Sequence, residues 1–325
     1  MSIIQRRTIL HAGSAIVAAA AVGLSTVQPT MAQAPQIGKQ APGYYRLKVG
    51  AFEVTVISDG SLSFPPSLWN ASQPEVLAAL TVDDRATNAI PFQLNTIVVN
   101  TGDKLVLIDT GTGGKYQDSS GVLLANLAAA GFRPEQIDTV VFTHLHPDHL
   151  WGATDKSGSK LLFPKADYVA SETEIAFWSQ AALPTQVPSG MRQMVEITQQ
   201  NLKTVAARTR AIKAGADVLP GIVSLGTPGH TPGHMSIHIG SNDEALLVAG
   251  DVVANATLSF RNPAWGISFD VDQALAAQTR VAFLDRCVAD KTMVASYHLP
   301  FPAIGHVVRD GSAYRWLPAE WSWTV

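Results

Sequence analysis

The sequence predicts an α/β domain that carries a functional site on loops at the ends of its strands. Patterns typical of strands and of helices alternate along the chain, as in domains where helices cover a sheet. One of the predicted strands, Val140 to Phe142, is short and wholly apolar, and polar side chains follow it directly. The chain has 325 residues, of which 46% are hydrophobic and 15% are charged, so it can bury a sizeable core.

The composition argues against a nucleic-acid partner and excludes an internal disulfide. The formal charge of −3 at pH 7 leaves no basic surplus for a nucleic-acid backbone, so we expect a small-molecule substrate and no nucleic-acid partner. Cys287 is the single cysteine, so no internal disulfide can form. Nothing beside Cys287 would lower its pKa, and we expect it to be a small core residue.

Residues 1–34 are predicted to be an export signal rather than part of the fold. Arg6 and Arg7 precede an apolar run over residues 12–24, and Ala32-Gln33-Ala34 is typical of a cleavage site. The arginine pair favours twin-arginine export, and an ordinary secretory signal is the alternative. The apolar run is too short to span a membrane comfortably. We therefore expect a mature domain over residues 35–325, periplasmic or secreted, without a stable membrane anchor.

Strand and helix patterns can be placed along the first half of the mature chain. Strand-like alternation over residues 52–57 is ended by the turn residues Ser58-Asp59-Gly60, and residues 61–90 are irregular. That irregular stretch either forms a wall of a pocket or is a surface excursion. The remaining elements predicted here are a hairpin over 94–100 and 104–108, a helix over 122–131, and the apolar strand described above.

The second half continues the alternation. A capping-box-like start at Ser171 predicts a short helix over 171–180. A loose apolar stripe predicts a longer helix over 191–214, whose apolar side chains belong to the core. The remaining predicted elements are strands over 218–227, 236–239, 245–249 and 293–297 and a helix over 272–288.

The stretch from Thr139 to Gly152 carries the strongest functional signal. After the apolar strand come His144, His146, Asp148 and His149. His144 and His146 are two residues apart, so on an extended segment they point the same way, and Pro147 stiffens the backbone between the potential ligands. Imidazole nitrogens and carboxylate oxygens together suit zinc, iron, cobalt or manganese. A structural zinc site or a chance grouping of histidines is the alternative.

The spacing His-x-His-x-Asp-His resembles the signature of the metallo-β-lactamase superfamily. Three further ligand positions follow in the order of that superfamily, namely His230 in Gly-His-Thr-Pro-Gly-His, Asp251 in Ala-Gly-Asp-Val and His298 in Tyr-His-Leu-Pro. The resemblance implies a four-layer αββα sandwich with two metal ions. Within the superfamily, methyl parathion hydrolases and related lactonases are similar to this chain over residues 41–46, 100–111, 298–306 and 311–318.

The resemblance also implies roles for individual residues. His144, His146 and His230 would hold one ion, Asp148, His149 and His298 the other, and Asp251 would bridge them. Asp109 would brace the metal loop from behind, although capping a turn is the alternative. His234, four residues after His230, is expected to support the site from behind or to cap a turn.

Four aromatic residues are candidates for the substrate pocket. Trp178 and Tyr116 fall where the family has pocket aromatics, and packing in the core is the alternative for each. Trp151 and Tyr297 stand where close relatives have small residues. Both lie beside predicted metal ligands, so they would narrow the pocket or donate a hydroxyl group to the substrate.

Two ions of this kind generate a hydroxide nucleophile at neutral pH and polarise the oxygen of the scissile bond. Zinc is expected first, with cobalt, manganese or iron as alternatives, and Asp148 is a candidate proton donor to the leaving group. We therefore expect a hydrolase of lactones and aryl esters that uses a metal-bridging hydroxide, with phosphotriesterase side activity. The alternatives are phosphotriester hydrolysis as the main activity, a non-hydrolytic metal-binding or di-iron protein, and a thioesterase of the glyoxalase II type.

The carboxyl-terminal tail is rich in aromatic residues. Trp316, Trp321 and Trp323 lie within eight positions of one another. Because exposed aromatic side chains are costly, the tail is expected to dock on the body of the domain or on a second subunit. The second alternative would make the protein a homodimer.

Overall fold

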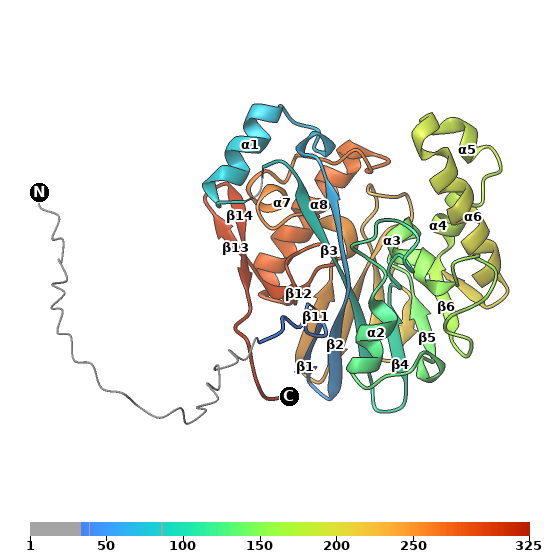
Figure 1. The fold of residues 1–325 in the computed structure, drawn as a ribbon. Coiled ribbons are helices and arrows are strands. Elements are labelled where there is room, and N and C mark those ends of the chain that lie inside the picture. The colour runs from blue at the N-terminus through green and yellow to red at the C-terminus, as the bar shows by residue number, and fades with distance from the viewer. Residues whose placement is uncertain (1–33, 39, 86) are drawn as a thin grey trace, which may run out of the picture. The chain divides into compact units, whose positions relative to one another are not determined.

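Two seven-stranded β-sheets face each other, and helices cover their outer sides (Figure 1). The structure is a computed structural model that describes residues 34–38, 40–85 and 87–325. Residues Ala41–Val325 form one compact unit. The predicted export signal lies outside the described residues apart from Ala34. Among the described residues, no helix combines the length and the apolar character that crossing a membrane requires.

The first sheet has its strands in sequence order, from β1 at one edge to β7 at the other. β1 to β4 pair antiparallel, and β4 to β7 pair parallel. Parallel neighbours need crossover connections, and the outer helices lie in those connections. The strands are β1 (Tyr44–Val49), β2 (Phe52–Phe64), β3 (Ile90–Asn100), β4 (Leu105–Ile108), β5 (Thr139–Val141), β6 (Asp167–Ser171) and β7 (Thr209–Ile212).

The second sheet runs in the order β14-β13-β12-β11-β10-β9-β8. Its pairs are antiparallel except for β11 and β12, which are parallel and are connected through the longest helix. The strands are β8 (Asp217–Leu219), β9 (Ile222–Gly226), β10 (Met235–Ser241), β11 (Glu244–Val248), β12 (Met293–Ala295), β13 (Ile304–Asp310) and β14 (Ala313–Pro318).

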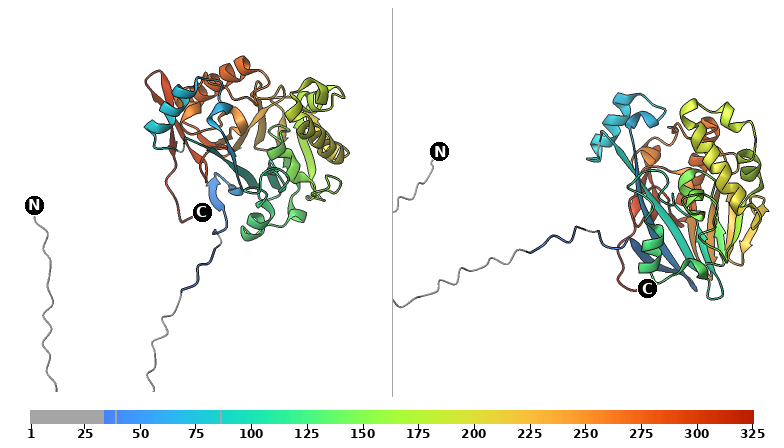
Figure 2. Two further views of the ribbon diagram at one scale, coloured as in Figure 1. Left: turned by 45° about the horizontal axis from the view of Figure 1, so that its top comes forward. Right: turned by 45° about the vertical axis from the view of Figure 1, so that its right-hand side comes forward.

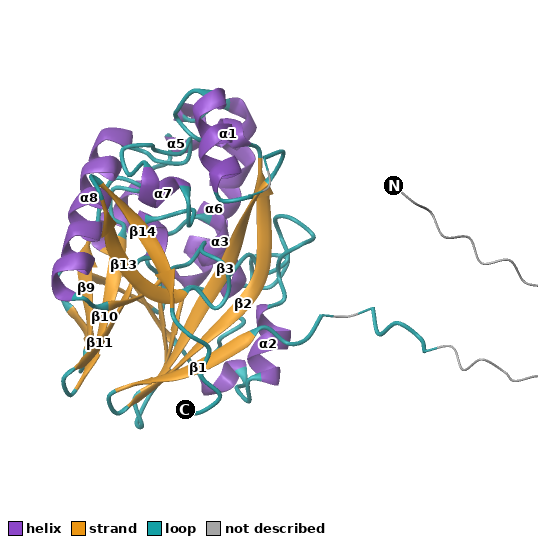
Figure 3. Ribbon diagram, turned by 90° about the vertical axis from the view of Figure 1, so that its left-hand side faces the viewer, coloured by secondary structure: helices purple, strands orange, loops and turns teal. Residues whose placement is uncertain are grey.

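Helices lie on both outer faces, and Figure 3 shows α2 and α8 on opposite sides of the paired sheets. Figure 2 shows α1 and α5 at one end of the sheets, away from the carboxyl terminus. The α-helices are α1 (Gln73–Val82), α2 (Leu123–Ala129), α3 (Pro147–Leu150), α4 (Glu172–Trp178), α5 (Leu183–Gln186), α6 (Arg192–Ala206), α7 (Leu258–Arg261) and α8 (Gln273–Asp290). Short 3₁₀ turns are η1 (Pro66–Leu68), η2 (Pro134–Gln136), η3 (Trp151–Ala153), η4 (Ser189–Met191) and η5 (Gly250–Val252).

The alternation of side chains along the central strands creates the layers. In β4, Leu107 points to the outer helices and packs with Leu127 of α2. Its neighbours Val106 and Ile108 point inward and pack with Ile237 of the second sheet. Because successive side chains of a strand point to opposite faces, one apolar strand supplies two layers of core. This arrangement confirms the αββα sandwich.

A third core lies between α8 and the outer face of the second sheet. Phe283, Leu284 and Cys287 of α8 pack there against Trp316 of β14. Burial raises the pKa of the Cys287 thiol to about 12, so the expectation of an inert core cysteine is confirmed. Trp316 is therefore part of the core of this domain.

Several predicted elements are confirmed with small shifts of their ends. The hairpin is formed by β3 and β4, the helix after it is α2, and the short helix is α4. The strands predicted over 236–239, 245–249 and 293–297 correspond to β10, β11 and β12, whereas the one predicted over 218–227 is divided into the antiparallel strands β8 and β9. The helix predicted over 272–288 is α8, and Asp272 caps it by accepting a hydrogen bond from the Leu275 N–H at 2.9 Å.

The prediction of one helix over 191–214 is wrong in its last third. α6 ends at Ala206, and the chain then forms β7, which pairs with β6 in parallel. Arg208 fixes the turn between them, because its guanidinium donates to the Lys165 carbonyl at 2.9 Å. Pairing with β6 satisfies the backbone groups of β7, and this tertiary contact outweighs the helical pattern.

The turn predicted at Ser58-Asp59-Gly60 is a β-bulge instead, and β2 continues to Phe64. The Asp59 carboxylate turns inward and accepts from the Thr112 and Leu123 N–H groups at 2.8 and 2.7 Å. Gly60 adopts a φ of 97°, and a Cβ there would lie 2.2 Å from the Ser119 carbonyl oxygen. The same residue types that end strands can also form a bulge, and the local pattern did not distinguish the two.

Regular structure also forms where none was predicted. The stretch over 61–90, expected to be irregular, contains the end of β2 and helix α1. β13 and β14 form a hairpin at the edge of the second sheet. In the tail, the Trp321 ring lies 4.5 Å from that of Tyr45 in β1. The tail thus docks on the body of the domain at Trp321, while the Trp323 side chain is 90% exposed.

Candidate metal centre

The seven predicted ligands come together at one end of the two sheets. The first sheet delivers four of them after β5, where the chain turns at His144 and His146 and enters α3 with Asp148 and His149. The second sheet delivers the other three: His230 lies between β9 and β10, Asp251 follows β11, and His298 follows β12. Loops at the carboxyl ends of strands are the usual place for such a site in α/β folds.

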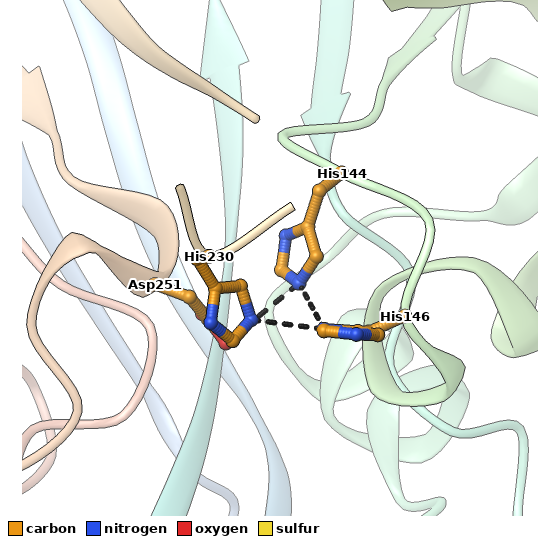
Figure 4. Close-up of side chains that lie close together, drawn as sticks. All are labelled: His144, His146, His230 and Asp251. Carbon is orange, nitrogen blue, oxygen red and sulfur yellow. Dashed lines mark hydrogen bonds and ion pairs between the residues drawn. The ribbon is translucent and has the colours of Figure 1, made fainter. Parts of the chain in front are cut away.

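Three histidines and one aspartate form a first cluster, which Figure 4 shows. The Nδ1 atom of His146 lies 2.9 Å from the Nε2 atoms of both His144 and His230. The Oδ2 atom of Asp251 is 3.3 Å from His230 Nε2 and 3.7 Å from His144 Nε2. Three ring nitrogens and one carboxylate oxygen therefore converge on a single point between these side chains.

A second cluster contains Asp148, His149 and His298. The Asp148 Oδ2 atom is 3.7 Å from His149 Nε2 and 3.5 Å from His298 Nε2. Asp251 also reaches this cluster, with its Oδ1 atom 3.3 Å from His149 Nε2 and its Oδ2 atom 3.0 Å from His298 Nε2. The carboxylate of Asp251 thus lies between the two clusters and contacts both.

The polar atoms of the site fit two cations. His149 Nε2 and Asp251 Oδ1 are buried and have no hydrogen-bond partner among the described residues. Such atoms are costly unless something else satisfies them, and a cation between them would do so. The donor set of imidazole nitrogens and carboxylate oxygens is that of zinc and similar divalent metals. The residues present therefore form two metal-binding clusters that share one carboxylate.

Two ligand histidines and the shared aspartate are in the forms that bind metals, whereas for His149, His230 and His298 burial alone would lower the pKa but the Asp251 carboxylate raises it. Burial, with the neighbouring histidines, holds the pKa of His144 and of His146 well below the ordinary value, so both rings are neutral. Burial alone would raise the pKa of Asp251, but His298 and His149 hold it well below its ordinary value. Neutral imidazole and ionised carboxylate are the forms that bind metals.

Asp109 orients one histidine of the second cluster from behind. Its Oδ2 atom lies 2.9 Å from His149 Nδ1, and its carboxylate also accepts from the N–H and the hydroxyl of Thr143, both at 2.8 Å. With Nδ1–H donated to Asp109, His149 presents Nε2 to the site. The structure thus places Asp109 behind the metal loop, with its side chain against His149.

His234 lies behind the site and belongs to neither cluster. Its Nδ1 atom is 2.8 Å from the Thr227 hydroxyl, and its Nε2 atom accepts a hydrogen bond from the Asp251 N–H at 3.0 Å. Burial and the nearby His230 lower the pKa of His234 to about 3, which keeps the ring neutral and able to accept. His234 therefore holds the backbone of Asp251 in place.

Comparison with known proteins agrees with this geometry. The profile of the metallo-β-lactamase superfamily matches residues 89–296, which is more than half of the chain. This chain belongs to the metallo-β-lactamase superfamily. A solved hydrolase of the superfamily, AbOPH, is 32% identical and superposes with a TM-score of 0.81, over 87% of this chain and 100% of that one.

Other members of the superfamily extend the comparison. AidC, a dizinc quorum-quenching lactonase solved in complex with a product, is 29% identical with a TM-score of 0.81, over 86% of this chain and 98% of AidC. The N-acyl homoserine lactonase of Bacillus cereus is 25% identical over 155 residues, which are 48% of this chain and 54% of that protein. The chain thus spans about half the length of the curated relatives it matches.

In this superfamily member, the metal centre opens into a cleft of about 410 Å³, counting the solvent at its mouth. The part of the cleft beyond the metal ligands is almost entirely apolar, and the Tyr116 hydroxyl is its one polar side-chain group there. Burial and the nearby charge of Asp148 raise the pKa of Tyr116, so its hydroxyl remains a donor at neutral pH. The other lining residues are Leu62, Phe64, Phe92, Pro147, Met194, Ile267 and Phe269.

Of the four aromatics expected around the substrate, only Tyr116 lines this cleft; the other three are buried outside its lining. Trp151 donates its indole N–H to the Thr198 hydroxyl at 3.0 Å. Trp178 packs edge-on against His146. The Tyr297 hydroxyl donates to the Asp148 carbonyl, and its ring lies 3.9 Å from that of His149. Trp178 and Tyr297 therefore contact ligand-bearing segments, and Trp151 connects the end of the metal loop to α6.

Two buried carboxylates behind the site were not predicted. Glu174 of α4 accepts from the Leu145 N–H at 3.0 Å, from the Trp178 indole N–H at 2.7 Å and from the Gly233 N–H at 3.0 Å. It thereby joins the loop of His144 and His146 to the loop of His230. The second is Asp270, whose Oδ1 atom lies 2.7 Å from His230 Nδ1. Neither residue lies in a metal-binding motif. The one local signal was the capping-box pattern that begins at Ser171 and includes Glu174.

Proposed function

We propose that this protein is a dinuclear metal-dependent hydrolase of lactones and aryl esters. The observation that carries the proposal is the pair of buried His and Asp clusters that share Asp251 and open into an apolar cleft. Beyond the metal ligands the cleft is lined by no lysine or arginine that would pair with a charged group of the substrate, so this part suits a neutral group. The likeness to the dizinc lactonase AidC over most of both chains supports lactones as substrates and zinc as the metal.

The residues assigned to the ions are His144, His146 and His230 for one and Asp148, His149 and His298 for the other, with Asp251 between them. When bound, two such ions supply Lewis acidity and a hydroxide nucleophile at neutral pH. The apolar walls of the cleft exclude water and hold the acyl or aryl part of the substrate.

Two side chains at the cleft carry out the remaining chemistry in this proposal. The Tyr116 hydroxyl donates a hydrogen bond to an oxygen of the substrate, because it is protonated and Tyr116 lines the cleft. Asp148 lines the cleft as well, and its carboxylate would accept the proton that the attacking water oxygen loses and pass it to the leaving oxygen. An alkoxide leaving group from a lactone needs that proton more than a phenolate does.

Phosphotriester hydrolysis is the second candidate. A phosphotriester is neutral, and the aromatic walls formed by Phe64, Phe92 and Phe269 suit its aryl group as well as they suit an aryl ester. The same residues of the metal centre would serve both reactions, so the choice between them depends on the relative rates.

The test is a comparison of kcat/KM on the zinc-loaded protein with four substrates: an aromatic lactone, an acyl-homoserine lactone, an aryl ester and an aryl phosphotriester. We expect a lactone or the aryl ester to lead by at least about tenfold. A lead of the phosphotriester by the same margin would make that reaction the main activity. Absence of turnover with all four, on protein that holds two zinc ions per chain, would overturn the proposal.

A further inference from the structure

Asp270 contacts a predicted metal ligand and the wall of the substrate cleft at the same time. It lies in the segment between α7 and α8, and its side chain is completely buried. Its Oδ1 atom is 2.7 Å from His230 Nδ1. Its Oδ2 atom accepts a hydrogen bond from the Ile267 N–H at 3.0 Å and lies 3.5 Å from a guanidinium nitrogen of Arg280. The two oxygens of one carboxylate therefore serve two different parts of the site.

The segment that Asp270 holds is part of the cleft. Ile267 and Phe269 both line it, and the Phe269 ring lies 6.4 Å from that of His146. The hydrogen bond from the Ile267 backbone N–H to the Asp270 carboxylate helps to fix the turn that presents these two side chains. A shift of Asp270 would consequently move the apolar wall with it.

Arg280 of α8 completes the arrangement from the other side. Its guanidinium donates to the carbonyl oxygens of Pro263 and Trp265 at 2.8 and 2.9 Å, and these residues belong to the same segment. It also donates to the Val252 carbonyl at 2.7 Å, directly after Asp251. Arg280 is 4% exposed, so these bonds are shielded from water. The wall segment is thus attached to the metal-bearing loops at several points, and Asp270 is the point that contacts a ligand.

All the partners of Asp270 are hydrogen-bond donors. His230 presents Nε2 to the metal cluster, so its Nδ1 carries the proton that it donates to Asp270. The Ile267 N–H and the Arg280 guanidinium are donors by their chemistry. A side chain at this position therefore needs two acceptor oxygens, one for His230 and one for Ile267 and Arg280. An asparagine has only one.

We propose that Asp270 is a positioning residue: its carboxylate holds both the His230 ring and the Ile267–Phe269 wall in place. Retention of the metal at the first cluster and recognition of the apolar part of the substrate then depend on the same carboxylate. The second half of this statement rests on the proposed function, because it assumes that the cleft binds the substrate.

Asp270→Asn tests both halves. Either orientation of the amide places an N–H₂ group against a donor, so one of the two contacts is lost. We expect zinc affinity to fall roughly 10- to 100-fold, measured by competition with a chromophoric chelator, as for other residues that orient metal ligands. We also expect the ratio of KM for a decanoyl substrate to KM for a butanoyl substrate to rise at least about threefold relative to wild type.

Asp109→Asn is the matched control, because Asp109 orients His149 in the same way and its carboxylate bonds to Thr143 and His149, neither of which lines the cleft. It should also weaken zinc binding while leaving the ratio of the two KM values at the wild-type level. A merely structural loss would change both variants alike. An unchanged zinc affinity in Asp270→Asn, or an equal KM ratio in the two variants, would overturn the proposal.

A readout without turnover separates this proposal from the proposed function. Binding of the hydrolysis-resistant amides decanamide and butanamide reports on the wall whether or not the protein hydrolyses esters. Asp270→Asn should weaken decanamide binding more than butanamide binding. If Asp270→Asn does not fold, Asp270→Glu takes its place: it keeps the charge but displaces both oxygens, so both losses are expected in smaller degree. Wild-type zinc affinity and amide selectivity in Asp270→Glu would also overturn the proposal.

Discussion

At the scale of individual residues, the carboxylate of Asp251 lies close to four of the five ligand histidines. Its Oδ1 atom faces His149, and its Oδ2 atom faces His144, His230 and His298, at distances of 3.0 to 3.7 Å. An anion surrounded by four imidazole rings keeps both clusters close and would reduce the repulsion between two bound cations. The hydrogen bond from its backbone N–H to His234 limits the movement of the segment that carries this carboxylate.

Asp251→Asn is therefore expected to abolish hydrolysis while the fold survives. The amide replaces one oxygen with an N–H₂ group that cannot bind a cation, so zinc affinity should fall by more than about 100-fold, beyond the usual effect of a residue that only orients a ligand. Metal content per chain and kcat/KM are the measurements, with circular dichroism as the control for folding. Wild-type turnover in a folded variant that holds two zinc ions would exclude the shared role of Asp251.

A second prediction distinguishes the role of a residue that lines the cleft from that of a residue behind it. Phe269→Ala removes a half-buried aromatic ring from the cleft wall, and we expect KM for an aryl ester to rise about 3- to 10-fold, with little change for a small aliphatic lactone. Trp178→Ala leaves the cleft lining intact but removes the indole N–H that donates a hydrogen bond to Glu174. It should lower kcat/KM for both substrates equally.

Steady-state kinetics with the two substrates on the two variants checks this contrast. A selective loss of the aryl substrate in Trp178→Ala would return that residue to the pocket role expected from the sequence. Thermal unfolding of both variants is the control, because truncating a buried tryptophan costs about 3–5 kcal/mol in stability.

At the scale of secondary-structure elements, local pattern predicted most of the central strands and the helices α2, α4 and α8. It failed where tertiary contacts decide the conformation. β7 is a strand because β6 is available to pair with it, and the chain bulges at Asp59 because Thr112 and Leu123 lie within reach of its carboxylate. Neither partner can be identified from the neighbouring residues in the sequence.

One glycine position at the end of the metal loop leaves no room for a larger residue. Gly152 follows α3, and a Cβ atom there would lie 1.8 Å from the Thr110 carbonyl oxygen. Gly152→Ala must separate this turn from the segment that carries Asp109, and overpacking of this kind costs about 1–3 kcal/mol or more. We expect a lower melting temperature and weaker zinc binding.

Gly190→Ala is the matched control for this substitution. No heavy atom lies within 4 Å of the Cβ position at Gly190, and its backbone is not in the left-handed region. This variant should melt like the wild-type protein in differential scanning calorimetry. Equal melting temperatures for Gly152→Ala and Gly190→Ala would contradict the close contact with Thr110.

At the scale of the whole molecule, the metal centre joins the two sheets. His144, His146, Asp148 and His149 follow a strand of the first sheet, and the other ligands belong to loops of the second. The spacing of these seven residues was readable because each ligand lies in a short motif. Asp270 and Glu174 were not predicted, because a carboxylate that orients a ligand is defined by which donors surround it after folding.

Removal of the metal is therefore expected to destabilise the entire domain. Ions that bind only the folded chain stabilise it by about 2.7 kcal/mol when their free concentration is 100 times Kd. A chelator should lower the melting temperature by about 5 °C or more, and added zinc should restore it. Scanning calorimetry across a zinc titration is the measurement. A melting temperature independent of zinc would show that the two sheets are held together without the ions.

The contact between the tail and β1 has a consequence for the connectivity of the chain. The Ser322 N–H donates to the Tyr45 hydroxyl at 3.2 Å, so the two ends of the unit from Ala41 to Val325 meet. A short linker could join them, and new ends could be opened at the exposed hairpin tip of Asn242 and Asp243. In such a circular permutant Asp251 and His298 would precede His144. The order of the ligands along the chain, by which the sequence is recognised, is thus a matter of ancestry, whereas the chemistry requires only their positions in space.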